Sequence, residues 1–86
     1  MIQIDGWTID MKDCNEPRLI RGFTKMSIVS FERRWETATD SYDGLNQIII
    51  RYYDRRDYIP GEELPERTLH AVLPRGSEKW IMVCNK

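Results

Sequence analysis

Apolar and polar residues alternate over short stretches of this chain, a pattern typical of β-strands. Residues 2–11 alternate on both sides of Asp5-Gly6, and an Asp-Gly pair between two such runs favours a tight turn that joins short strands. Residues 12–22 are largely polar. Pro17 favours at most one helical turn, over Arg18–Arg21, because proline is well tolerated at the first position of a helix.

Residues 23–36 have a less regular pattern. The apolar residues alternate in one frame up to Ile28 and in the opposite frame from Val29 onward. A strand with a β-bulge near these two residues explains the shift. The alternative is a helix that places Ile28, Phe31 and Trp35 on one face. The β-branched and aromatic content favours the strand.

The clearest strand is Gln47–Tyr53. Ile48, Ile50 and Tyr52 point to one side, and the other side also carries an apolar residue, Ile49. Because both faces have residues to bury, this strand is predicted to be central in its sheet.

The remaining segments are predicted to form loops and a hairpin. Residues 37–46 are predicted to be a loop, and Pro60-Gly61 indicates another loop after the central strand. Thr68–Leu73 and Lys79–Cys84 are apolar enough for strands, and Pro74–Ser77 between them has turn-forming residues. These last segments predict a β-hairpin.

Together the segments predict a mainly β fold, or an α+β fold with one short helix. We expect a small antiparallel sheet of four to five strands, which either leaves one face to be covered or curls into a partly closed barrel. Eighty-six residues fit a single domain, 1–86. The predicted core consists of apolar strand residues: Ile28, Phe31, Ile48, Ile50, Leu69, Val72, Ile81 and Val83.

Composition indicates a folded chain: 41% of the residues are hydrophobic and 10% are aromatic, which is enough to fill one core. No apolar run approaches the roughly 20 residues of a membrane span. The first residues lack the pattern of a signal peptide, so a cytoplasmic location is expected. Cys14 and Cys84 are predicted to be free thiols, because a disulfide framework requires a secretory context.

The formal net charge of −1 argues against a generally basic nucleic-acid binder. Acids outnumber bases in residues 1–17 and 59–66, whereas bases outnumber acids in residues 18–36 and 67–86. The simplest explanation is that acidic and basic segments neutralise one another within the fold. Nine of the thirteen bases are arginine, which suits bidentate carboxylate pairing and protein interfaces better than lysine does.

The sequence offers little for catalysis, metal or cofactor binding. One histidine and two distant cysteines do not make a zinc site, and the five glycines stand singly rather than in a phosphate-binding loop. His70 is expected to be a half-buried sheet residue. A dyad of His70 and Cys84 requires that their strands pair in register, which the sequence does not determine. We therefore predict no enzyme, no metal and no cofactor.

The candidate interaction surface combines arginine with aromatic residues. In proteins that bind single-stranded nucleic acids, aromatic side chains stack on bases and arginine contacts phosphates. The same residue types are also favoured at protein interfaces. Glu32, Asp54 and Asp57 stand among these residues and would repel phosphate, which favours a protein partner. The surface is predicted at Arg33, Arg34, Trp35, Arg51, Tyr53, Arg55, Arg56 and Tyr58, with an acidic loop at Glu62, Glu63 and Glu66.

The main functional hypothesis is a non-catalytic protein-interaction module that acts through a sheet face and charged loops. Its expected partner is another protein or a second copy of the chain. A second copy would form a homodimer through a strand edge or a sheet face. One alternative is a single-stranded nucleic-acid-binding protein that uses the strand rich in arginine and tyrosine. Another is a small phage or mobile-element inhibitor whose acidic loops block a nucleic-acid-binding groove.

Overall fold

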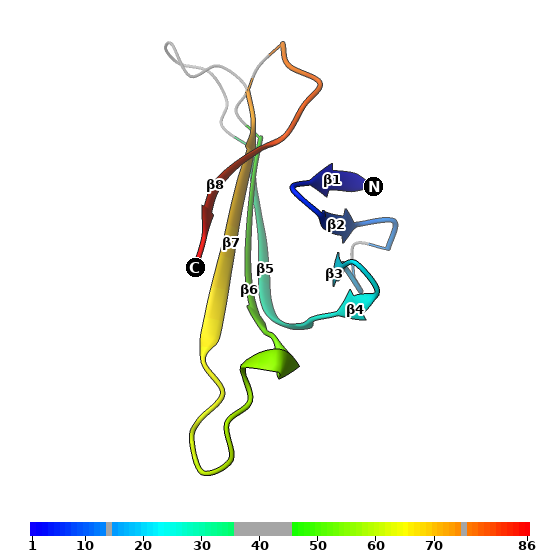
Figure 1. Cartoon of the computed structure of the whole chain (residues 1–86). Coiled ribbons are helices and arrows are strands. Elements are labelled where there is room, and N and C mark those ends of the chain that lie inside the picture. Colours follow the sequence, from blue (N-terminus) through cyan, green and yellow to red (C-terminus); the bar gives the residue numbers. More distant parts are fainter. Residues whose placement is uncertain (14, 36–45, 75) are drawn as a thin grey trace.

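The computed structural model describes residues 1–13, 15–35, 46–74 and 76–86, and these form two four-stranded antiparallel sheets (Figure 1). The first sheet has the order β1-β2-β3-β4, and the second has the order β5-β6-β7-β8. The first sheet contains β1 (Ile2–Ile4), β2 (Trp7–Asp10), β3 (Arg18–Arg21) and β4 (Thr24–Lys25). The second contains β5 (Ser27–Trp35), β6 (Asn46–Tyr53), β7 (Glu66–Leu73) and β8 (Ile81–Asn85).

The mainly β, antiparallel fold is confirmed, although the strands divide between two sheets instead of forming one. Neither sheet closes into a barrel within the described chain. The helical element described is the 3-10 turn η1 (Arg55–Asp57), so no described helix is long enough to cross a membrane.

The β1–β2 hairpin forms around the predicted Asp5-Gly6 turn. Ile4 and Trp7 are paired on either side of it, which leaves a two-residue loop. Both loop residues have positive φ, 48° at Asp5 and 85° at Gly6. This is the backbone that a type I′ turn requires, and it matches the twist of the strands it joins.

The helical turn predicted over Arg18–Arg21 is wrong, because these residues form β3. Leu19 pairs with Ile9 on β2, and both side chains are almost completely buried. Ladder hydrogen bonds and the burial of Leu19 outweigh the weak preference of Pro17 for the start of a helix.

The strand interpretation of residues 23–36 is confirmed for Ser27–Trp35, which form β5 with the predicted bulge, whereas Thr24–Lys25 form the separate strand β4 of the first sheet. In the β5–β6 ladder, Ile28 lies opposite Tyr52 and Ser30 lies opposite Arg51, so Val29 has no partner. This single extra residue accounts for the change of frame in the apolar pattern.

The core lies between the two sheets, and β6 is central in the second sheet as predicted. Ile48, Ile50 and Leu69 are completely buried, which confirms three predicted core positions. Ile28 and Phe31 are partly buried against the same core. The core also contains residues that the sequence analysis did not name: Ile2, Ile4, Trp7, Ile9, Leu19, Met26, Tyr52 and Ala71.

The core prediction is wrong for Val72, which lies on the outer side of β7, and for the last strand. Ile81 is 51% exposed and Val83 is 55% exposed. Met82 lies opposite the buried Ala71, so Met82 faces the core, and Ile81 lies opposite the half-buried Val72 on the other face. Successive side chains of a strand point to opposite faces. A mistake about which face is buried therefore reverses the assignment of buried and exposed residues along the strand.

The predicted β7–β8 hairpin is confirmed by antiparallel pairing. In its turn, the Ser77 N–H donates to the Pro74 carbonyl oxygen at 3.0 Å. The loop predicted at residues 37–46 lies outside the described residues except for Asn46, which begins β6.

Candidate interaction surfaces

One face of the β5–β8 sheet packs on the β1–β4 sheet, and no described strand covers the other, which we call the outer face (Figure 1). Directly opposed residues in antiparallel strands point to the same side. Ile49 lies opposite Glu32 on β5 and His70 on β7, and Arg51 lies opposite Thr68. The outer face therefore presents apolar, charged and polar side chains together.

Two predicted surface arginines are paired with acids on this face. Arg34 Nε donates to Glu32 Oε1 at 2.8 Å, and this bond lowers the pKa of Glu32 from its ordinary value. Arg51 Nε lies 3.8 Å from Glu66 Oε1. These pairs are exposed, so they add little to stability, but they neutralise the charges that a phosphate would need.

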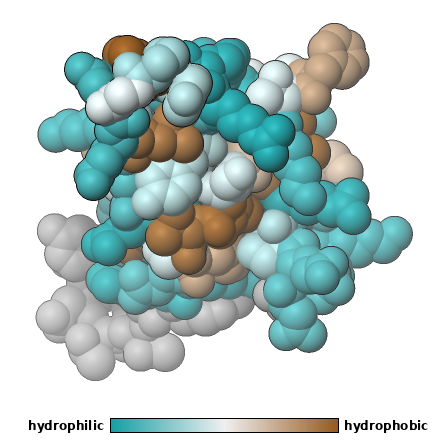
Figure 2. Space-filling view, turned by 90° about the horizontal axis from the view of Figure 1, so that it is seen from below, coloured by the Kyte–Doolittle hydropathy of each residue, from teal (hydrophilic) through white to brown (hydrophobic). Residues whose placement is uncertain are grey.

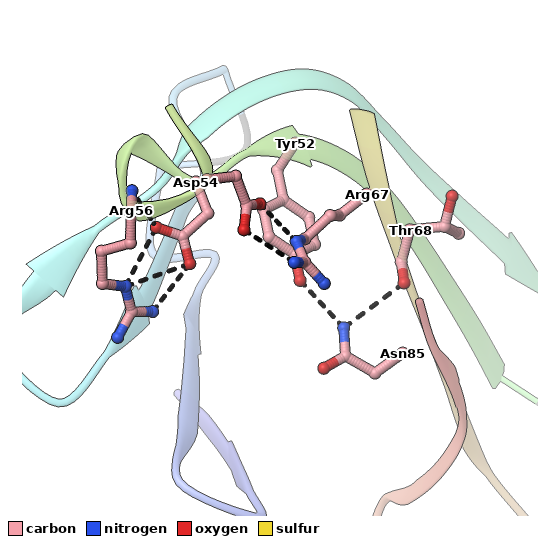
Figure 3. A network of polar contacts seen from close by, with 7 residues as sticks. Tyr52, Asp54, Arg56, Arg67, Thr68 and Asn85 are labelled. Atoms are coloured by element: carbon pink, nitrogen blue, oxygen red, sulfur yellow. Dashed lines mark hydrogen bonds and ion pairs between the residues drawn. The ribbon is translucent and has the colours of Figure 1, made fainter. Parts of the chain in front are cut away.

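The η1 end of the molecule contains two further acid–arginine pairs (Figure 3). Asp54 accepts hydrogen bonds from the Arg56 backbone N–H at 3.0 Å and from Arg56 Nη2 at 2.7 Å, and the side-chain bond lowers the pKa of Asp54. Asp57 accepts hydrogen bonds from Arg67 Nε and, at 2.7 Å, from Arg67 Nη2, which lowers the pKa of Asp57. The second pair links η1 to β7.

An amide side chain links β6, β7 and β8 next to these pairs (Figure 3). Asn85 Nδ2 donates to Tyr52 Oη at 2.9 Å and to the Thr68 carbonyl oxygen at 3.4 Å. Tyr52 thereby buries its ring in the core while its hydroxyl has a partner. The Asn85 amide therefore ties the three strands together beside the Asp57–Arg67 pair, which is the contact that joins η1 to the sheet.

Arg33 lies on the inner side of β5, away from the outer face. It is opposite Ile48, and its Nε donates to Asn46 Oδ1 at 3.5 Å. Trp35 pairs through its backbone with Asn46 at the end of β5. These two positions do not join the other predicted arginines.

The predicted interaction surface thus divides among different parts of the fold. Arg34, Arg51 and Tyr53 belong to the outer face, whereas the η1 end carries Arg55, Arg56 and Tyr58. Of these, Arg55 has no salt bridge within the described chain, and Tyr58 is 64% exposed. In the predicted acidic loop, Glu62 and Glu63 are exposed, whereas Glu66 is the first residue of β7.

The register of β7 and β8 places His70 directly opposite Cys84. His70 Nε2 lies 2.9 Å from Gln47 Oε1, so the glutamine orients the imidazole. Both residues are half-buried on the outer face, and no hydrogen bond joins Cys84 to His70 in the described structure. Among the described side chains, no group of three or more His, Cys, Asp or Glu residues is arranged to hold a metal ion.

A cleft near the β3–β4 turn was not anticipated from the sequence. It is lined by residues from the β2–β3 connection to the start of β5 and by one residue of η1: Asn15, Glu16, Pro17, Arg18, Phe23, Thr24, Lys25, Met26, Ser27, Ile28 and Arg55. Phe23 is fully exposed at its rim. The sequence signal that could have indicated it is Phe23 directly after Gly22 and between the polar residues Arg21 and Thr24, because an aromatic residue in a tight turn has no neighbouring side chain to pack on.

The chain matches no known protein-family model, and no curated protein and no solved structure is detectably similar to it.

Proposed function

We propose that this chain is a non-catalytic protein-interaction module that forms a homodimer through the edge strand β8. The observation that carries the proposal is the composition and exposure of this edge. The residues of β8 are all uncharged, and Ile81 and Val83 are 51% and 55% exposed. An exposed apolar edge strand is a template for pairing with another chain.

The opposite edge of the same sheet differs in the features that normally prevent such pairing. β5 carries Glu32, Arg33 and Arg34 within the strand, together with the bulge at Val29. Charged side chains and bulges protect edge strands from unwanted association. β8 also has a register shift, which leaves Val83 without an opposite residue on β7, but it has no charged residue or proline.

A second copy of the chain fits this edge for reasons of symmetry and charge. Most homo-oligomers are twofold dimers in which the same patch meets itself. Antiparallel pairing of β8 with β8 of another copy places an uncharged strand opposite itself, so no like charges oppose one another within the strand. The paired sheets then form one continuous outer face that carries Ile49 and Tyr53 from each copy and is available to a protein partner.

Nucleic-acid binding on the strand rich in arginine and tyrosine has less support. Arg51 lies near Glu66, Arg34 bonds to Glu32, and Arg56 bonds to Asp54. A phosphate chain would have to replace these carboxylates. The mixed charge of the outer face is better suited to a protein surface, where acids and bases alternate.

The dimer proposal is tested by measuring the molar mass of the purified chain in solution across a range of concentrations. We expect a species of twice the 10.3 kDa chain mass that dissociates on dilution. Val83→Lys should shift the chain to the monomer, since each copy would then present a lysine at the shared edge. Val29→Lys is the matched control, because Val29 is 47% exposed on the other edge strand, and it should leave the dimer intact.

A wild-type chain that is monomeric at every concentration would contradict the proposal. Dissociation by Val29→Lys, with Val83→Lys still dimeric, would place the interface at β5 instead.

A further inference from the structure

The cleft at the β3–β4 turn combines an exposed aromatic ring with cationic side chains. Figure 2 views the molecule from the η1 end and shows hydrophobic side chains exposed between hydrophilic ones. We propose that this cleft binds an acidic segment of a partner protein, with Phe23 as the apolar anchor. This site is separate from the β8 edge, so the proposal does not depend on the homodimer.

Phe23 has no role in the core of the domain. Its relative exposure is 108%, the highest among the large hydrophobic residues of the described chain. Aromatic side chains dominate interfaces because they bury a large apolar area with few rotatable bonds. A fully exposed phenylalanine beside a cleft is therefore placed to be covered by a partner.

The turn that presents Phe23 is anchored on both sides. Gly22 has a φ of 62°, which lets the chain reverse tightly. The Arg21 guanidinium carbon lies 5.1 Å from the centre of the buried Trp7 ring, a cation–π contact. After the turn, the Met26 N–H donates to the Leu19 carbonyl oxygen at 2.8 Å. A turn held in this way loses little conformational freedom on binding, which favours affinity.

The charges around the cleft indicate the chemistry of the partner. Among the described residues, Arg18, Lys25 and Arg55 line it together with a single acid, Glu16. The salt bridges found in the described chain use other arginines, so these three cations have no carboxylate partner there. Three cations facing one anion attract a negatively charged segment.

A polypeptide fits this lining better than a single-stranded nucleic acid does. Glu16 lines the cleft together with the cations and would repel a phosphate chain, whereas a peptide backbone can donate an N–H to it. Phe23 is also the one aromatic ring among the described lining residues, and a single ring gives successive bases no continuous platform on which to stack.

The experiment uses fluorescence anisotropy with the full chain and three labelled probes. The first probe is a dodecapeptide of aspartate, glutamate and leucine, the second replaces each acid by its amide, and the third is a single-stranded dT oligonucleotide of twelve nucleotides. We expect the acidic peptide to bind at least about tenfold more tightly than the amide peptide, and more weakly as ionic strength rises. The oligonucleotide should bind more weakly than the acidic peptide.

Two variants and two matched controls assign the binding to the cleft. Phe23→Ala should weaken the acidic peptide by about tenfold or more, as expected for an anchor residue, and Arg55→Gln should weaken it by several fold. Tyr58→Ala removes an exposed aromatic residue that is not in the lining, and Lys79→Gln removes an exposed cation elsewhere. Both controls should bind like the wild type, and thermal melts should show that all four variants are folded.

Three results would overturn the proposal. The first is no measurable binding of the acidic peptide by the wild type. The second is binding that survives Phe23→Ala and Arg55→Gln unchanged. The third is tighter binding of the oligonucleotide that is lost in Phe23→Ala, which would make the cleft a nucleic-acid site.

Discussion

Ile50 offers the most direct test of where the core of this domain lies. It is completely buried in the central strand β6, and it stands opposite Phe31 on β5 and Leu69 on β7. Ile50→Ala removes three carbon groups from this site, which corresponds to about 2.4 kcal/mol of transfer free energy at roughly 0.8 kcal/mol for each group. The cavity left behind adds to this loss, so we expect a decrease of about 3–5 kcal/mol in the free energy of unfolding.

The assay is urea denaturation combined with a thermal melt. In a domain of this size each 1 kcal/mol shifts the melting temperature by about 4–8 °C, so a loss of 3 kcal/mol corresponds to about 12–24 °C. A chain of 86 residues has a total stability of only about 4–13 kcal/mol, and Ile50→Ala can therefore unfold it. Ile50→Val keeps the test measurable, because it should cost about 0.5–1.5 kcal/mol.

The control is Val29→Ala, which shortens a β-branched residue that is 47% exposed in the bulge of β5. It should change the free energy of unfolding by less than about 0.5 kcal/mol. A near-neutral Ile50→Ala, or a Val29→Ala of equal cost, would refute the assignment of the core to the inner face of β6.

Two further predictions follow from the η1 end and from the first turn. Because hydrogen bonds from arginine hold the pKa values of Asp54 and Asp57 below their ordinary values, the folded chain binds fewer protons than the unfolded chain, and the free energy of unfolding should fall as the pH drops below about 4. Denaturation at several pH values should show that Arg67→Gln makes this fall shallower, and an unchanged pH profile would contradict the assigned ion pair. Gly6→Ala places a side chain at a φ of 85° and should cost about 1–2 kcal/mol in urea denaturation, whereas unchanged stability would mean that the turn has another conformation.

The alternation of apolar and polar residues was sufficient to predict a strand where that alternation is strict. It was also sufficient where a single extra residue explains the break in the alternation. The segment around Ile48 and Ile50 was recognisable as a central strand because both of its faces carry apolar residues. The bulge at Val29 was recognisable because one extra residue reverses the frame of everything after it. Such features depend on neighbouring residues of the chain, and they need no knowledge of the partner strand.

Pattern was misleading in β8, where every residue from Ile81 to Cys84 is able to pack in a core. An uncharged run does not say which of its faces points inward. That is decided by the pairing with β7, where Met82 meets the buried Ala71 and Val83 has no opposite residue. The same pairing brought His70 and Cys84 opposite each other.

The candidate sites depended still more on the tertiary structure. The sequence by itself determined the strand segments other than β3 and β4, the Asp5-Gly6 turn and the content of arginine and aromatic residues. Only the fold decided that Arg34 and Arg51 lie beside carboxylates, and that Phe23 and Arg55, far apart in the chain, line one cleft. The physical reason is that alternation and turn preference act between neighbouring residues, whereas charge pairing and exposure depend on which strands meet, and that is set by the packing of the two sheets.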